Sequence, residues 1–183
     1  SLKEPEEVPV VIWGVALWYT RKLGIKAGDY YRNLDLKLDT QIRMQKEFPD
    51  ALLLPGIWPD FGVVAEPSAF GCPVLWSEHE APVARPAISS MNQVLSMKPV
   101  NVKESGILPQ VVEAYEYYFK NLNKKYIEDY GYVDGSVFFL GPLETAALIR
   151  GYCEFLLELY DNPQLAHKLL DIVTTTLLEW LQY

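Results

Sequence analysis

Residues 50–74 read DALLLPGIWPDFGVVAEPSAFGCPV, and this stretch decides the fold. The apolar run 51–54 is typical of a buried strand, and Pro55-Gly56 ends it. A single carboxylate, Asp60, then stands among large apolar residues. A glycine at the end of a strand, followed by a loop with one charge, is typical of the ligand-binding edge of a parallel sheet.

Two further segments repeat this arrangement, VPVVIWG (8–14) and GSVFFLGP (135–142). The three runs end at Gly14, Gly56 and Gly141, and helical periodicity follows each of them. Strand followed by helix, repeated in this way, predicts parallel pairing with helical crossovers. Because no GxGxxG follows any strand, the order favours a β/α barrel over a Rossmann sheet. We predict an α/β fold that is the N-terminal portion of a (β/α)8 TIM barrel, with about three parallel strands.

Residues 1–183 are expected to form a single partial domain. Helices are predicted over 29–48 and 107–130, near 67–70, over 144–160, and from Pro163 with Asp161 or Asn162 as N-cap. A hairpin insertion is predicted over 73–88. Since a barrel needs eight strands, we expect these residues to have no turnover alone, and we expect self-association to cover their apolar strand edges.

Charge and composition exclude several kinds of partner. The net charge is −8 and the densest basic stretch is Lys124-Lys125, so neither nucleic acid nor an anionic membrane is expected. The longest apolar run, 8–19, contains Pro9 and Gly14 and is too short to span a bilayer. Two cysteines form no disulfide framework, which favours a cytoplasmic protein.

Candidate site residues cluster at the predicted strand ends. We expect Asp60 to be catalytic and Trp13, Gly14, Gly56, Trp58, Glu66 and Gly141 to bind substrate. Alternative interpretations remain open: Asp60 caps the next helical turn, Glu66 pairs with the next helix, and the tryptophans pack in the core. No metal site is expected, because neither cysteine has a CxxC partner or a histidine at ligand spacing.

Four segments carry a family resemblance: VPVVIWGVALWYTRKLGI, PDALLLPGIWPDFGVVAEPSAFGCPV, GPLETAALIRGYCEFLLELY and DNPQLAHKLLDIVTTTLLEWL. In this order they resemble the uroporphyrinogen decarboxylase superfamily over essentially the whole chain. The resemblance implies a β/α barrel of which the chain holds the N-terminal part. It also implies that Asp60 lies near the aspartate that binds pyrrole groups in the decarboxylases, although the spacing to Gly71 is two residues longer here. A carboxylate suits that role because it accepts several N–H donors and stabilises positive charge.

Two branches of the superfamily differ in their motifs. The decarboxylase branch begins with a Trp-x-Met-Arg-Gln-Ala-Gly-Arg stretch whose arginines meet the substrate carboxylates. The corresponding IWGVALWYTRKLG has one basic pair, Arg21-Lys22, and Ala146-Ala147 stand where that branch has a tyrosine. An octacarboxylate substrate requires fixed guanidinium groups, which a chain with a pI near 4.8 does not supply.

The other branch transfers methyl groups to or from a corrinoid protein, and EPSAFGCPV (66–74) resembles its Glu-Ala-x-Ala-x-Gly-Cys form. The resemblance favours a corrinoid-dependent methyltransferase. The alternatives are a uroporphyrinogen decarboxylase of haem biosynthesis and a non-catalytic module that binds a corrinoid or tetrapyrrole. No cofactor is expected within these residues, whereas zinc and a corrinoid are implied for the full-length protein. The implied partners are a corrinoid protein or a tetrapyrrole-like small molecule.

Overall fold

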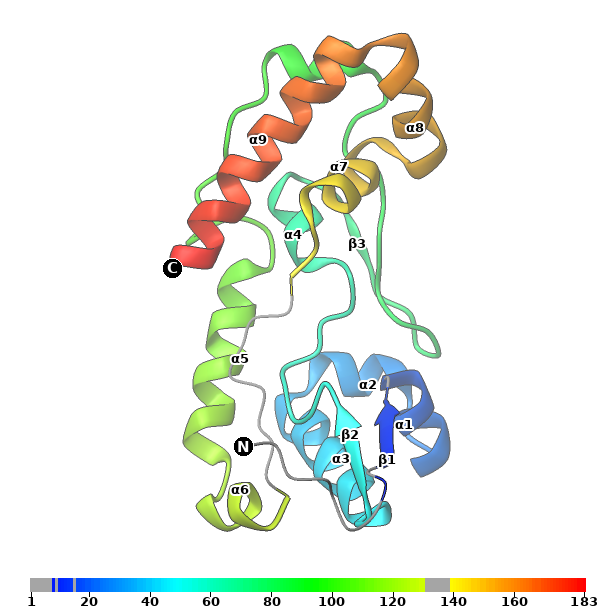
Figure 1. The fold of residues 1–183 in the computed structure, drawn as a ribbon, viewed down its shortest axis with the longest axis vertical. Coiled ribbons are helices and arrows are strands. Elements are labelled where there is room, and N and C mark those ends of the chain that lie inside the picture. Colours follow the sequence, from blue (N-terminus) through cyan, green and yellow to red (C-terminus); the bar gives the residue numbers. More distant parts are fainter. Residues whose placement is uncertain (1–7, 9, 15, 131–138) are drawn as a thin grey trace. The chain divides into compact units, whose positions relative to one another are not determined.

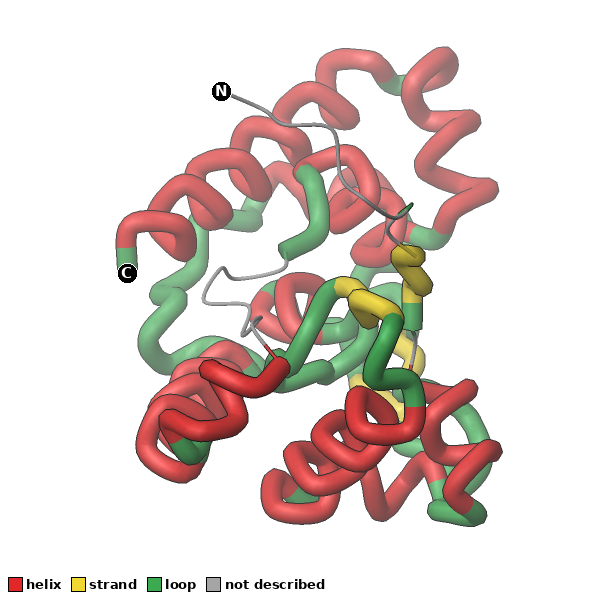
Figure 2. The backbone as a smooth tube through the Cα atoms, turned by 60° about the horizontal axis from the view of Figure 1, so that its bottom comes forward, coloured by secondary structure: helices red, strands yellow, loops and turns green. Residues whose placement is uncertain are grey.

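The computed structural model describes residues 8, 10–14, 16–130 and 139–183. The elements in chain order are β1 (Val10–Trp13), α1 (Ala16–Leu23), α2 (Ala27–Arg32), α3 (Leu34–Glu47), β2 (Ala51–Leu54), α4 (Ala65–Ala69), β3 (Val74–Leu75), β4 (Val83–Ala84), the 3-10 helix η1 (Met91–Leu95), α5 (Leu108–Asn121), α6 (Lys124–Tyr130), α7 (Pro142–Arg150), α8 (Tyr152–Asp161) and α9 (Pro163–Gln182). The class is α/β, with short strands among many helices (Figure 2).

The chain divides into two compact units, which are described separately. The first unit comprises Ser1–Asp60, Ser77–Ala81 and Ala114–Ser136. The second unit comprises Phe61–Trp76, Pro82–Glu113 and Val137–Tyr183.

In the first unit, β1 and β2 pair in parallel, as predicted, and α1, α2 and α3 form the crossover between them (Figure 1). The register places Val10 opposite Ala51 and Trp13 opposite Leu54, so both strands end at the same edge. The prediction that β1 is buried on both faces is wrong, because Val10, Val11 and Trp13 are exposed by 55%, 52% and 61%. In the part of the chain that the structure describes, β2 is the one strand paired with β1, which explains this exposure.

In the second unit, α7, α8 and α9 pack together, and α9 also contacts η1 (Figure 1). Their apolar core includes the fully buried Val64, Ile149, Phe155, Leu169 and Val173. The predicted hairpin is confirmed by the antiparallel pairing of β3 with β4. No helix in the described ranges is long and apolar enough to cross a bilayer.

Predicted helix boundaries were wrong at three places. The helix expected over 29–48 is divided at Asn33, whose side chain accepts a 3.0 Å hydrogen bond from the backbone N–H of Leu36 and caps α3. The helix expected over 144–160 ends at Gly151, where φ is +101°. The helix expected over 107–130 is divided between α5 and α6.

The start of α9 follows its prediction, with Asn162 at the N-cap and Pro163 in the first turn. Most of the predicted strand 135–142 lies outside the described residues. Its last described part, 139–141, forms no strand, and α7 starts at Pro142.

Candidate functional site

The candidate site lies at the carboxyl ends of β1 and β2. Immediately after β1, the Gly14 N–H donates a 2.8 Å hydrogen bond to the carbonyl oxygen of Leu54, the last residue of β2. The two chain segments therefore leave the sheet at one edge, where ligands bind in parallel sheets. Pro55 and Gly56 follow β2, with a cis Leu54-Pro55 bond and a Gly56 φ of +100°. A φ of this sign favours glycine, so Gly56 gives the loop its turn.

One glutamine on α3 fixes the loop that carries Asp60. The Gln41 side-chain N–H group donates to the Trp58 carbonyl oxygen at 2.7 Å, and its side-chain oxygen accepts from the Trp58 backbone N–H at 3.0 Å. The same Nε2 donates to the Tyr30 hydroxyl at 2.8 Å. Because both backbone groups of Trp58 are held by one side chain, the loop has a defined position two residues before Asp60.

Asp60 lies inside a cluster of polar aromatic residues. Its exposed fraction is 7%, although it belongs to a loop. Five buried residues interact with it electrostatically: Tyr19 from α1, Tyr30 and Tyr31 from α2, Lys37 from α3, and Tyr118 from α5. We call these residues and Asp60 the Asp60 cluster. Asp60 does not cap the next helix, because the N-cap of α4 is Val64.

Burial and the Asp60 charge together shift the proton affinities of the cluster. Burial, with a smaller contribution from Asp60, raises the pKa of Tyr19 to about 12. The same two causes raise the pKa values of Tyr30, Tyr31 and Tyr118, so all four phenols keep their protons at neutral pH. Burial lowers the pKa of Lys37 to about 8, and Asp60 opposes this shift. The cluster therefore combines hydroxyl donors with an amine that titrates near neutral pH.

Gly14 allows one of these tyrosines to reach its place. A Cβ atom at Gly14 would lie 2.0 Å from the Tyr19 hydroxyl oxygen, a distance at which the ring would have to move. The glycine predicted to bind substrate thus has a second role, since it makes room for a member of the Asp60 cluster.

The remaining predicted site residues are distributed over both units. Trp13 is 61% exposed at the end of β1, and Trp58 is half-buried with its backbone held by Gln41. Glu66 and Gly141 belong to the second unit. There they are close in space, because the Glu66 carboxyl accepts a hydrogen bond from the backbone of Leu140 and Gly141 is the N-cap of α7.

Glu66 is a buried carboxyl group in the first turn of α4, with an exposed fraction of 4%. Burial raises its pKa to about 7, and Glu144 adds to the shift, whereas backbone hydrogen bonds from Glu66 itself and Leu140 oppose it. A carboxyl group that titrates near neutral pH can donate or accept a proton under physiological conditions.

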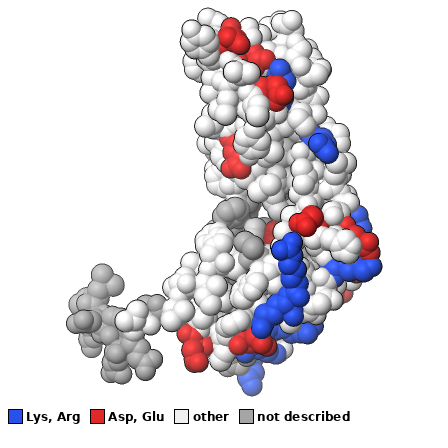
Figure 3. Space-filling model, turned by 90° about the vertical axis from the view of Figure 1, so that its right-hand side faces the viewer, with Lys and Arg blue, Asp and Glu red and all other residues white. Residues whose placement is uncertain are grey.

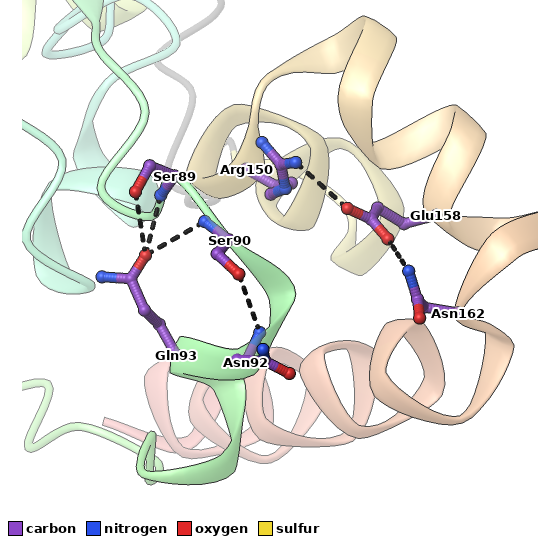
Figure 4. Close-up of polar contacts among 7 residues, drawn as sticks. All are labelled: Ser89, Ser90, Asn92, Gln93, Arg150, Glu158 and Asn162. Carbon is purple, nitrogen blue, oxygen red and sulfur yellow. Dashed lines mark hydrogen bonds and ion pairs between the residues drawn. The ribbon is translucent and has the colours of Figure 1, made fainter.

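Two surface hollows are lined by residues other than those of the Asp60 cluster. One, of about 330 Å³, is lined in the first unit by residues that include Thr20, Lys26 and His79. The other, of about 470 Å³, is lined in the second unit by residues that include Pro86, Ser89 and Arg150. Figure 4 shows that Arg150 points toward Glu158, whose carboxylate it meets at 3.0 Å, so this guanidinium already has a structural partner.

The described residues contain no metal-binding cluster, and the pKa of the buried Cys72 thiol is raised. Within the described ranges, no group of three or more His, Cys, Asp or Glu side chains could hold a metal ion. Cys72 and Cys153 are free, and burial raises the pKa of the Cys72 thiol to about 11. Acidic and basic side chains lie next to one another on the face drawn in Figure 3, which fits the paired surface charges Arg21–Glu80 and Lys26–Glu78.

A sequence comparison decides the family. The family model for uroporphyrinogen decarboxylase (URO-D) matches residues 2–183. The chain belongs to the URO-D family. No curated protein matches this URO-D family chain. Among solved structures, it is similar to a methyltransferase from Methanosarcina mazei, with 15% sequence identity and a TM-score of 0.64. The match covers 95% of this chain and 49% of the methyltransferase, so the URO-D family chain spans about half the length of that protein.

Sequence reasoning missed most of the Asp60 cluster in this URO-D family chain. Its member Lys37 and the loop anchor Gln41 are buried four residues apart on α3, beside the buried Leu38 and Ile42. Polar residues one turn apart beside an apolar face were the signal that could have identified them.

The first prediction concerns Gln41. Replacing it with Leu removes the partner of both Trp58 backbone groups and of the Tyr30 hydroxyl, and we expect a loss of about 3 kcal/mol in the free energy of unfolding. Gln45→Leu on the same helix is the control, because Gln45 is partly buried and donates to the Ala51 carbonyl oxygen at 2.9 Å. Urea denaturation measures both variants. An equal loss in the two would contradict the anchoring role of Gln41.

The second prediction concerns pH. Because the pKa of Glu66 is raised from 4.5 to about 7, its protonated form stabilises the fold below pH 4.5, and this stability is lost as the pH rises through 7. Glu66→Gln keeps the neutral shape, so at about pH 8 it should exceed the wild type by about 2–3 kcal/mol. Denaturation curves at several pH values test this, with the exposed Glu113→Gln as control. The same pH dependence in wild type and Glu66→Gln would refute the prediction.

Proposed function

We propose that this chain is part of a corrinoid-dependent methyltransferase and that its Asp60 carboxylate binds the substrate. The observation that carries the proposal is the burial of Asp60 in the loop that follows β2, where its charge acts on four buried tyrosines and on Lys37. Membership of the URO-D family and the fold similarity to a methyltransferase support the general class. In finer terms, we propose that β1 and β2 belong to a (β/α)8 barrel.

Within this proposal, Asp60 binds and orients the substrate. A fixed carboxylate accepts N–H donors, and it stabilises positive charge more effectively in a water-poor site than in water. The four tyrosines keep their protons, so they offer hydroxyl donors, and the Gln41 anchor keeps the loop in place before a ligand arrives. Trp13, Gly14, Gly56 and Trp58 lie around this edge of the sheet as the proposed substrate-binding residues.

Zinc and a corrinoid protein are the metal and the partner that we propose for the whole protein. When bound, zinc would lower the pKa of an acceptor thiol so that it reacts as the thiolate. Among the described residues, no group of three or more possible ligands could hold it. A cytoplasmic location belongs to the same proposal, since both cysteines are free.

Two other functions remain candidates. Decarboxylation of uroporphyrinogen is favoured by the family to which the chain belongs. It requires fixed guanidinium groups for the substrate carboxylates, however, and Arg21 and Arg32 on α1 and α2 are exposed. A non-catalytic module that binds a corrinoid or tetrapyrrole is favoured by the electrostatic partners that Asp60 already has.

The third prediction tests the role of Asp60 in the whole protein. We expect methyl transfer from methylcobalamin to a thiol acceptor, and we expect Asp60→Asn to reduce its rate by roughly a hundred- to thousandfold. Because Asp60 is buried, the variant should also melt at a lower temperature. Rates are therefore measured well below the melting temperature, with Asp39→Asn on the exposed face of α3 as control.

Each outcome separates the candidates. Release of carbon dioxide from uroporphyrinogen without methyl transfer would establish the decarboxylase. Tight corrinoid binding without either reaction would establish the binding module. An Asp60→Asn variant with full methyl-transfer activity would remove Asp60 from the site.

The fourth prediction is self-association, which we propose through the exposed apolar side chains of β1. A two-stranded sheet is rarely stable by itself, and Val10 and Val11 are more than half exposed. Light scattering on the 183-residue chain should therefore detect a dimer or larger species. Val11→Lys should shift it toward monomer, whereas Leu157→Lys at an exposed position of α8 should not. A monodisperse monomer at high concentration would contradict the proposal.

A further inference from the structure

Lys37 is a charged residue in an unusual position. It lies in the middle of α3, and its exposed fraction is 0%, although a lysine side chain normally carries its ammonium group to solvent. Its Nζ lies 5.8 Å from the ring centroid of Tyr30 and 6.0 Å from that of Tyr31. These two rings form a T-shaped pair with centroids 5.1 Å apart. Two aromatic faces thus stabilise the cation within the protein.

Tyr30 connects Lys37 to the Asp60 loop, because the Gln41 side chain that donates to the Tyr30 hydroxyl also donates to the carbonyl oxygen of Trp58, two residues before Asp60. Asp60 has the opposite charge to Lys37. Its electrostatic attraction favours the protonated form of Lys37, while burial disfavours it. The other basic side chains of α1 and α2, including Arg21, Lys22 and Arg32, are exposed. Lys37 is therefore the buried cation that α3 brings to the Asp60 cluster, and it comes from the same helix as Gln41, which fixes the Asp60 loop.

We propose that Lys37 is a positioning residue for Asp60: its ammonium, held over the rings of Tyr30 and Tyr31, keeps Asp60 as an ionised carboxylate in a fixed orientation. The inference rests on the proposed function in one respect, namely that Asp60 binds a substrate. The charge pairing itself is a property of the first unit and can be measured without any reaction.

The titratable groups of the Asp60 cluster come from α1, α2, α5 and the loop after β2, besides α3. The rings of Tyr30 and Tyr31 on α2 lie beside the Lys37 Nζ, and its electrostatic partner Asp60 follows β2. Tyr19 on α1 and Tyr118 on α5 complete the cluster through their interaction with Asp60. The tyrosines stay neutral at physiological pH, so Asp60 and Lys37 are the two members of the cluster that carry charge.

The test replaces Lys37 with Met, which keeps most of the side-chain length without the charge. We expect the melting temperature to fall by roughly 10 °C, because a buried positive charge that attracts Asp60 is removed. In carbon NMR the Asp60 carboxyl signal should titrate at higher pH than in the wild type, because the loss of an attracting cation disfavours the ionised form of a buried carboxyl group. A merely structural lysine would not move this signal.

Lys46→Met is the matched control. Lys46 is also on α3, and its Nζ lies 4.8 Å from the ring centroid of Tyr126, but it is exposed. Its replacement should change neither the melting temperature nor the Asp60 titration.

The double variant Asp60→Asn/Lys37→Met removes both charges. If the two groups are paired, it should melt higher than Lys37→Met alone, and it should fold even where the single variant does not. Losses that simply add in the double variant, or an Asp60 signal that titrates in Lys37→Met as in the wild type, would overturn the inference.

Activity separates this inference from the proposed function. In the whole protein, Lys37→Met should lower the rate of methyl transfer, and the pH at which the rate rises should follow the Asp60 titration. If the wild type transfers no methyl group but the Asp60 signal still responds to Lys37→Met, the proposed function fails and the positioning role of Lys37 stands.

Discussion

A buried carboxylate loses its hydration, and protein groups must replace the lost interactions with water. This constraint organises the first unit. Asp60 is 7% exposed, and four helices contribute side chains that respond to its charge. Without compensation, a buried charge of this kind costs several kcal/mol. The cluster therefore requires α1, α2, α3 and α5 to occupy fixed positions around one loop. The same requirement explains why Gln41 holds the backbone at Trp58, since a mobile loop would lose these interactions.

The sequence predicted the parts of this arrangement that depend on local chemistry. Gly14 and Pro55-Gly56 marked the ends of β1 and β2 correctly, and the pairing is parallel, as the strand–helix order required. The two helix breaks at Asn33 and Gly151 were missed. In each case a single residue overrides a continuous apolar pattern, through a side-chain cap at Asn33 and a positive φ at Gly151.

The Asp60 cluster could be predicted only in part. Asp60 itself was recognisable as a lone charge after a strand, but its partners come from segments up to 58 residues away in sequence, as Tyr118 shows. The tyrosines contributed to apolar patterns that are equally typical of a core, and only packing reveals that they share one charge. The burial of Glu66 depends likewise on the backbone of Leu140, which no local pattern indicates.

The complete burial of Lys37 has a further consequence. An amine that no solvent reaches is closed to acylating reagents and to modifying enzymes while the native state persists. Chemical labelling of Lys37 can therefore proceed only through molecules in which α3 has separated from its neighbours, whereas the exposed Lys46 on the same helix reacts at once. The ratio of the Lys37 labelling rate to the Lys46 labelling rate therefore measures how often the first unit opens locally, with both lysines on one helix.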